Sequence, residues 1–159
     1  MRDYRWKFDA SRYSYAYLLS QVSEDRVQSS IMEMLSVRRI ASTVVDAGGK
    51  KIRGGFIRAA KAAGVRNAGS LVAQGRGAAQ AGLPDIVGCL PGGRALFIEC
   101  KAPQWARIGR GGALRVLRSA GEPTEDQLAF LDTMEEAGAL CMVAWSQDDV
   151  MDALREAGY

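Results

Sequence analysis

The chain has 159 residues, a length typical of one domain, with 48% apolar and 25% charged residues and a formal net charge of +3. It contains no histidine, which excludes Ser-His and Cys-His catalysis and histidine-based metal sites, and its three cysteines lack the CxxC spacing of a zinc site. No apolar run approaches the ~20 residues of a membrane span, and no signal-peptide h-region opens the chain, so we expect a cytoplasmic protein.

The charges are unevenly distributed along the chain. Residues 47–121 hold thirteen Lys or Arg and two acids, a net +11, whereas residues 122–159 hold ten acids and one base, a net −9. This division favours one basic face for a polyanion and one solvated acidic face, although helices and loops can differ in surface charge without any function. The two acids inside the basic block are Asp85 and Glu99.

Residues 1–22 are interpreted as an N-terminal aromatic arm and residues 23–159 as one domain. Aromatic residues alternate with other residues over 4–17, which predicts extended chain with one aromatic face. Packing of that face on the core or on a second subunit is favoured over stacking on nucleic-acid bases.

Ser23 is a good N-cap, and apolar residues at helical spacing after it predict a helix over 23–38. A strand is predicted over 42–47, followed by a segment rich in Gly, Ala and bases in which a helix over 56–63 and a strand over 70–74 are expected.

Two strands, 85–90 and 94–100, are predicted to form a hairpin through Pro91-Gly92-Gly93. Residues 102–121 are predicted to form a basic, Gly-rich loop. A helix over 124–138 is predicted next, with a capping box that pairs Thr124 with Gln127. An apolar strand over 139–145 and a last helix from residue 146 onward complete the chain. This order predicts one α/β domain with a mixed sheet.

The predicted hairpin brings charged residues together. If Leu90 pairs with Arg94, Asp85 lies directly opposite Glu99, with Cβ atoms about 5 Å apart, and Lys101 falls on the same face. Two opposed carboxylates repel each other, so they favour a bound cation. Oxygen ligands without histidine or thiolate point to Mg²⁺ or Mn²⁺.

The loop length decides this prediction. A two-residue turn at Gly92-Gly93 would shift the register and place Asp85 and Glu99 on opposite faces. Taken singly, Asp85 also suits the start of a strand, and Glu99 with Lys101 suits a solvated strand end.

The segments GLPDIVG (82–88) and IECK (98–101) resemble the PD-(D/E)xK nuclease motif, and more narrowly the VRR-NUC family of virus-type replication-repair nucleases. That family shows a helical Glu-xxx-Gln, then Gly-x-Pro-Asp, Glu-x-Lys and a Gln that opens the next helix. The matching residues here, spread over about 24–154, are Glu24 with Gln28, Gly82 to Asp85, Glu99 with Lys101, and Gln127. The resemblance implies a restriction-endonuclease-like core and a bacterial or phage origin.

The resemblance also implies metal-dependent hydrolysis of a phosphodiester bond. Asp85, Glu99 and the backbone carbonyl of Cys100 would hold Mg²⁺ or Mn²⁺, and Glu24 would complete the shell or bind a second ion. Lys101, with a pKa lowered by burial and the metal, would orient or deprotonate the attacking water. Gln127 is either a site residue or only part of its capping box. The residues expected to contact DNA are Gln28, Lys50, Lys51, Arg53, Arg58, Lys61, Arg107, Arg110, Arg115 and Arg118.

Stand-alone members of the family are similar to Holliday-junction resolvases, which favours a homodimer that cuts branched DNA. The alternatives are a nuclease for flaps or nicked duplex, a DNA-binding module with a decayed site, and an α/β protein unrelated to nucleic acid.

Overall fold

The computed structural model describes residues 6–45 and 82–159. In that part of the chain, four strands form a mixed sheet in the order β1-β2-β3-β6, in which β1, β2 and β3 pair antiparallel and β6 pairs parallel with β3. A hairpin, β4–β5, forms a separate two-stranded sheet. The strands are β1 (Ala41–Val44), β2 (Ile86–Cys89), β3 (Ala95–Cys100), β4 (Trp105–Ile108), β5 (Leu114–Arg118) and β6 (Leu140–Ala144).

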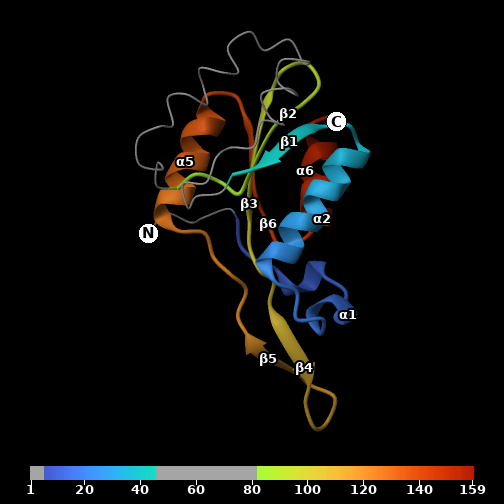
Figure 1. The fold of residues 1–159 in the computed structure, drawn as a ribbon. Helices are drawn as coiled ribbons and strands as arrows, with labels where there is room; N and C mark the ends of the chain where they lie inside the picture. The colour runs from blue at the N-terminus through green and yellow to red at the C-terminus, as the bar shows by residue number, and fades with distance from the viewer. Residues whose placement is uncertain (1–5, 46–81) are drawn as a thin grey trace.

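Long helices of the described residues flank the mixed sheet (Figure 1). They are α2 (Glu24–Val37), α5 (Glu125–Glu136) and α6 (Gln147–Glu156). α5 lies on one side of the sheet, and α2 and α6 lie together on the other. Each begins at a predicted cap: the side chains of Ser23, Thr124 and Ser146 all accept a backbone N–H from the first turn. The predicted α/β architecture with a mixed sheet flanked by helices is therefore confirmed.

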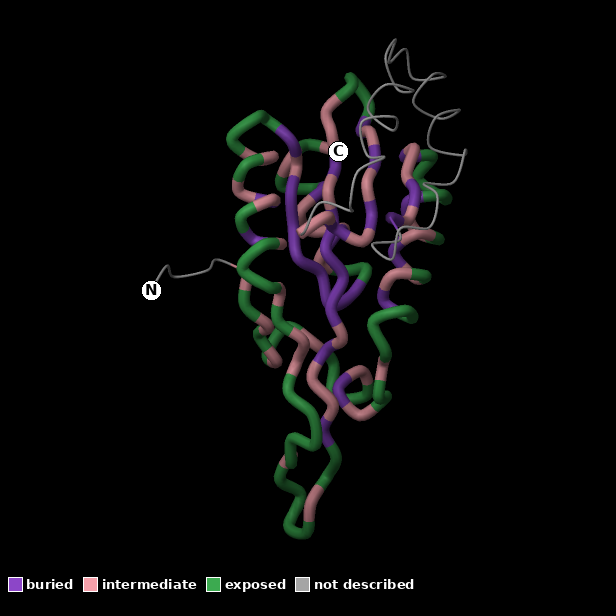
Figure 2. Tube along the Cα trace, turned by 60° about the vertical axis from the view of Figure 1, so that its left-hand side comes forward, coloured by how far each residue is buried: buried purple, intermediate pink, exposed green. Residues whose placement is uncertain are grey.

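The sheet separates two apolar clusters. Ile31, Leu35 and Leu154 from α2 and α6 pack with Ile86 and Ile98 of the sheet on one side. On the other side, a cluster beneath α5 contains Leu131, Val143 and Trp145. Phe97 and Phe130 pack against this cluster, and their two rings meet edge to face. Side chains alternate along β3, so Leu96 and Ile98 lie in the first cluster and Ala95 and Phe97 pack against the second. Figure 2 shows that buried residues are concentrated in the sheet.

The register of β2 and β3 is the one that the three-residue loop predicts. Ile86 pairs with Ile98 and Val87 with Phe97, and Leu90 donates its N–H to the carbonyl of Arg94. The same ladder, continued by one pair, places Asp85 opposite Glu99.

The N-terminal segment differs from the expected extended chain. It contains a short 3-10 helix, η1 (Ala10–Arg12), and one helical turn, α1 (Tyr15–Leu18), begun by Asp9 and Ser14 as caps. The aromatic side chains of Trp6, Phe8 and Tyr13 pack on the cluster beneath α5. They therefore cover the core of their own chain.

The expected loop over 102–121 is also wrong in part. Residues 105–108 and 114–118 form the β4–β5 hairpin, which projects from the lower end of the molecule in Figure 1. The other expectations for helices and strands hold within a residue or two where the structure describes the chain. The expected helix over 56–63, the strand over 70–74 and the last two residues of the strand over 42–47 lie outside the described residues. None of the described helices is long and apolar enough to cross a membrane.

Candidate active site

Asp85 immediately precedes β2 and is hydrogen-bonded to the ends of two other strands. Its backbone carbonyl accepts the N–H of Val45, and Oδ2 of its side chain accepts the N–H of Cys100 at 2.8 Å. The preceding Pro84 is buried, so the chain enters the strand from a fixed position. The Asp85 carboxylate is therefore oriented toward the end of β3.

Glu99 is the most enclosed charged residue that the structure describes, with 1% of its surface exposed. Its Oε1 accepts hydrogen bonds from Nζ of Lys101 at 2.5 Å and from Nε2 of Gln127 at 2.6 Å. Its Oε2 is buried and has no hydrogen-bond partner among the described residues. A buried carboxylate oxygen without a donor is costly, so this atom needs a cation or a proton.

Burial is the main reason why the pKa of Glu99 rises to about 7, and the negative charge of Asp85 adds to the shift. Glu24 contributes in the same direction, which places its charge within reach of Glu99, while Lys101 opposes the shift. The protein alone therefore holds Glu99 near the boundary between its protonated and ionised forms at neutral pH.

Lys101 is the cation of this cluster and is 8% exposed. Burial lowers its pKa, but the hydrogen bond to Glu99 and the charges of Glu99, Glu24 and Asp85 outweigh burial and raise it overall. Three carboxylates thus raise the pKa of this one ammonium group in the protein without a metal, whereas the expected lowering refers to burial together with a bound metal. Gly121 packs on the Lys101 side chain, where a Cβ would meet its Cδ at 3.4 Å.

Gln127 serves the helix and the cluster at once. Its Oε1 accepts the N–H of Thr124, which closes the capping box of α5, and its Nε2 donates to Glu99. The expected capping box is therefore present, and the same side chain also contacts Glu99. Glu24 begins α2 on the other side of the sheet and is exposed, and Gln28 lies one turn later and is half-buried.

A glycine fixes α5 against the loop that carries Asp85. Gly82 has φ +86°, and a Cβ there would lie 2.2 Å from the carbonyl oxygen of Asp126. Because this is shorter than any van der Waals contact, only glycine allows the loop to approach the first turn of α5 so closely. The contact sets the distance between the Asp85 segment and Gln127.

The donor set suits a hard cation. Asp85 and Glu99 supply carboxylates on one face, and the Cys100 carbonyl points to the same side as its N–H, toward Asp85, because the two groups of one strand residue share an edge. Burial raises the pKa of the Cys100 thiol, which disfavours its thiolate form. No group of three or more His, Cys, Asp or Glu side chains close enough to hold a metal occurs in residues 6–45 and 82–159.

The basic residues expected to contact DNA divide into two groups. Arg107, Arg110, Arg115 and Arg118 all lie on the exposed β4–β5 hairpin. The others, Lys50, Lys51, Arg53, Arg58 and Lys61, lie outside the described residues. Sequence reasoning missed the hairpin and the contact of Gly121 with Lys101. The alternation of apolar residues and arginines on either side of Gly109–Gly112 was the signal for the hairpin.

A comparison with protein-family models, with curated proteins and with solved structures finds no match for this chain. The resemblance to the VRR-NUC family therefore depends on the motif residues themselves.

Proposed function

We propose that this protein is a metal-dependent, structure-selective DNA endonuclease of the PD-(D/E)xK type. The observation that carries the proposal is the buried Oε2 of Glu99, which lacks a donor among the described residues and lies on the same face as the opposed Asp85 carboxylate. An arrangement of this kind is costly unless a cation or a proton occupies it. The motif residues imply a restriction-endonuclease-like core, and the sheet of three antiparallel strands and one parallel strand supports that part of the proposal.

The chain's own residues divide the work of phosphodiester hydrolysis. Asp85, Glu99 and the Cys100 carbonyl would hold Mg²⁺ or Mn²⁺, with Glu24 joining through water. The bound ion would neutralise the scissile phosphate and lower the pKa of water. Lys101, hydrogen-bonded to Glu99, would orient the attacking water as an ammonium group or stabilise charge on the phosphate. Gln127 would keep Glu99 turned so that Oε2 faces the cation.

The proposed substrate is branched DNA. Residues 47–121 carry a net +11, and four arginines stand on the exposed hairpin beside the site, so a polyanion is the natural partner. A homodimer acting on a four-way junction is proposed because the junction offers two phosphodiesters related by a two-fold axis. The N-terminal aromatic residues no longer favour a dimer, since they pack on their own core.

A panel of labelled DNA substrates tests the function. Junction, flap, nicked and linear DNA would be incubated with the purified protein and Mg²⁺, Mn²⁺ or EDTA. We expect cutting with either metal, strongest on the junction, and none with EDTA. If the protein cut flaps or nicked duplex in preference to the junction, it would be a flap or nick nuclease and not a junction resolvase. Binding without cutting under every condition would replace the enzyme with a DNA-binding module.

A further inference from the structure

The β4–β5 hairpin is a projecting two-stranded ribbon with two unlike faces. Arg107 pairs directly with Arg115, and Ile108 pairs with Leu114. Because side chains alternate along a strand, the arginine pair lies on one face and the Ile108–Leu114 pair on the other, together with Val116. Ile108 is 55% exposed and Val116 is 48% exposed, so these two side chains of the apolar face are open to solvent, whereas Ala106 on the same face is buried. Figure 2 shows that much of the ribbon is exposed.

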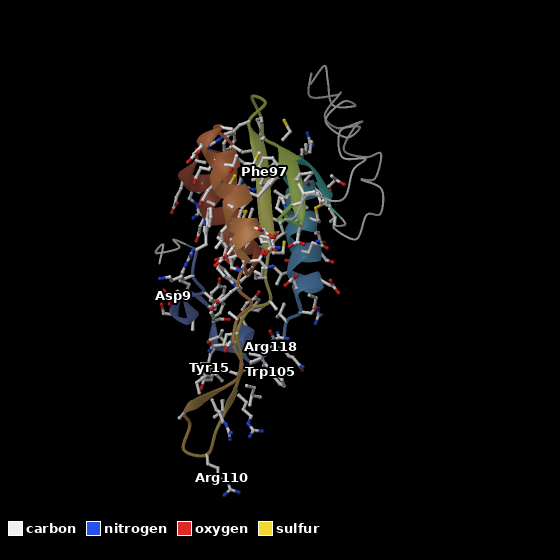
Figure 3. The ribbon with its side chains drawn as sticks, turned by 90° about the vertical axis from the view of Figure 1, so that its left-hand side faces the viewer. Asp9, Tyr15, Phe97, Trp105, Arg110 and Arg118 are labelled. Atoms are coloured by element: carbon white, nitrogen blue, oxygen red, sulfur yellow. The ribbon has the colours of Figure 1, made fainter. Side chains whose placement is uncertain are left out.

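The arginine face favours an anion. Like charges directly opposite each other across a ribbon are destabilising, and Arg107 and Arg115 occupy such a pair. Arg110 adds a third charge at the tip of the hairpin, as Figure 3 shows. None of the three forms an ion pair with a described residue, and residues 102–121 contain no acid. A phosphate backbone would relieve this repulsion.

The base of the ribbon is fixed to the candidate active site. β4 begins at Trp105, four residues after Lys101, and Gly121, which packs on Lys101, follows β5 by three residues. Nη2 of Arg118 donates at 2.8 Å to the carbonyl of Val22, just before α2. Figure 3 shows Trp105 and Arg118 together at the base and Arg110 at the far end. DNA held by the ribbon would therefore lead toward Glu99 and Lys101.

We propose that the β4–β5 ribbon is the element that selects branched DNA: its arginine face binds phosphates of any duplex, and its apolar face packs on bases exposed where the duplex is interrupted. The proposal rests on the proposed nuclease function and says which element lets that nuclease distinguish branched DNA from linear duplex. A two-stranded ribbon fits a DNA groove. Apolar side chains that wedge between base steps must pay for unstacking, which costs least where pairing is already broken. Ile108 and Val116 therefore contribute only on branched DNA.

Binding measured in EDTA separates the two faces without cleavage. The double variant Arg107→Ala/Arg115→Ala should bind linear duplex and junction about tenfold more weakly, and its slope of log K against log salt should fall by about 2. The double variant Ile108→Thr/Val116→Thr keeps β-branched residues and hence strand propensity. It should bind linear duplex within twofold of wild type and the junction about tenfold more weakly.

Matched controls come from the far end of α2. Arg38→Ala and Val37→Ser alter an exposed arginine and a residue that is 79% exposed, and both should bind like wild type. Circular dichroism would confirm that each variant is folded. The proposal is overturned if the arginine variant binds like Arg38→Ala, or if the apolar variant loses no junction preference. It is also overturned if the apolar variant instead converts a dimer into a monomer by light scattering, because the face would then bind a second copy.

The two proposals fail in different ways. If wild type binds both DNAs and the variants behave as expected, but no metal supports cutting, the ribbon assignment stands and the nuclease does not. If wild type cuts DNA and the ribbon variants bind normally, the nuclease stands and the ribbon assignment does not.

Discussion

Nε2 of Gln127 donates a 2.6 Å hydrogen bond to Oε1 of Glu99, while Oε1 of the same Gln127 side chain accepts the N–H of Thr124. One side chain therefore joins the first turn of α5 to the buried carboxylate on β3. The position of Glu99 Oε2 depends on this link, because Gln127 and Lys101 both hold the other oxygen.

Gln127→Ala and Thr124→Ala separate the two roles of this link. Each removes part of the capping box, so each should lower the free energy of unfolding by about 1 kcal/mol. Only Gln127→Ala also frees the Glu99 carboxylate, and we expect it to reduce cleavage at least tenfold, whereas Thr124→Ala keeps near wild-type turnover. Chemical unfolding and single-turnover cleavage measure the two effects. Equal losses of activity in both variants would assign Gln127 to the cap alone.

Gly82→Ala and Gly92→Ala form a matched pair. Both glycines have positive φ, +86° and +84°, but only at Gly82 would a Cβ meet another atom within 4 Å. Gly92→Ala should cost about 1 kcal/mol from backbone strain and leave cleavage unchanged. Gly82→Ala should cost clearly more and should lower cleavage, because the loop carrying Asp85 must move away from Asp126. If the two variants were equally stable and equally active, the close approach of Gly82 to α5 would have no role in the site.

The raised pKa of Glu99 predicts a pH-dependent stability. The folded protein binds the Glu99 proton more tightly than the unfolded chain, whose carboxyl has its usual pKa near 4.5. The protonated Glu99 therefore contributes to the free energy of unfolding below about pH 4.5, and this contribution is lost as the pH rises through about 7. Without divalent metal, wild type and Glu99→Gln should be similarly stable near pH 5. Near pH 8 the variant should be more stable by roughly 2–3 kcal/mol.

Urea unfolding at the two pH values measures this difference, and the comparison with Glu99→Gln cancels the titration of all other groups. Adding Mg²⁺ near pH 8 should stabilise wild type and not the variant, because a bound cation replaces the missing proton. If Glu99→Gln were no more stable than wild type near pH 8, the claim that the ionised Glu99 carboxylate destabilises the metal-free fold would be wrong.

The oligomer and the substrate can be tested together. Light scattering should give twice 17.1 kDa, about 34 kDa, for the purified protein. Excess linear duplex should leave junction cutting largely unaffected, whereas raised salt should weaken binding to both. A monomer that cuts junction and duplex equally would remove the resolvase-like activity and leave the site at Asp85 and Glu99 in place.

The parts of the fold that were predictable are those in which one signal dominates. The length of the Pro91–Gly93 loop sets the register that opposes Asp85 and Glu99, and the caps at Ser23, Thr124 and Ser146 mark three helix starts. In the N-terminal arm two periodicities compete. Alternation suggests a strand, but Tyr13 and Tyr17 are also four residues apart, and their rings stack at 5.5 Å, with Tyr17 in the turn α1 and Tyr13 just before it.

The parts of the site that were not predictable depend on tertiary approach. The packing of Gly82 on Asp126 and of Gly121 on Lys101 joins residues that are distant in sequence. The pKa of Lys101 depends on how many carboxylates surround it, and that number is decided by the arrival of α2 beside the end of β3. Neither these glycine contacts nor the pKa of Lys101 can be inferred from the local sequence pattern alone.

The most direct test of the central claim is metal-dependent cleavage by Asp85→Asn, Glu99→Gln and Lys101→Ala, measured beside Glu125→Gln, an exposed acid in the first turn of α5. We expect each of the three site variants to lose cleavage by at least a thousandfold with Mg²⁺ and with Mn²⁺, because each removes a ligand or the only cation of the described cluster. They should still fold and still bind DNA in EDTA, and Glu125→Gln should cut like wild type. Normal turnover by any one of the three would contradict the assignment of the site.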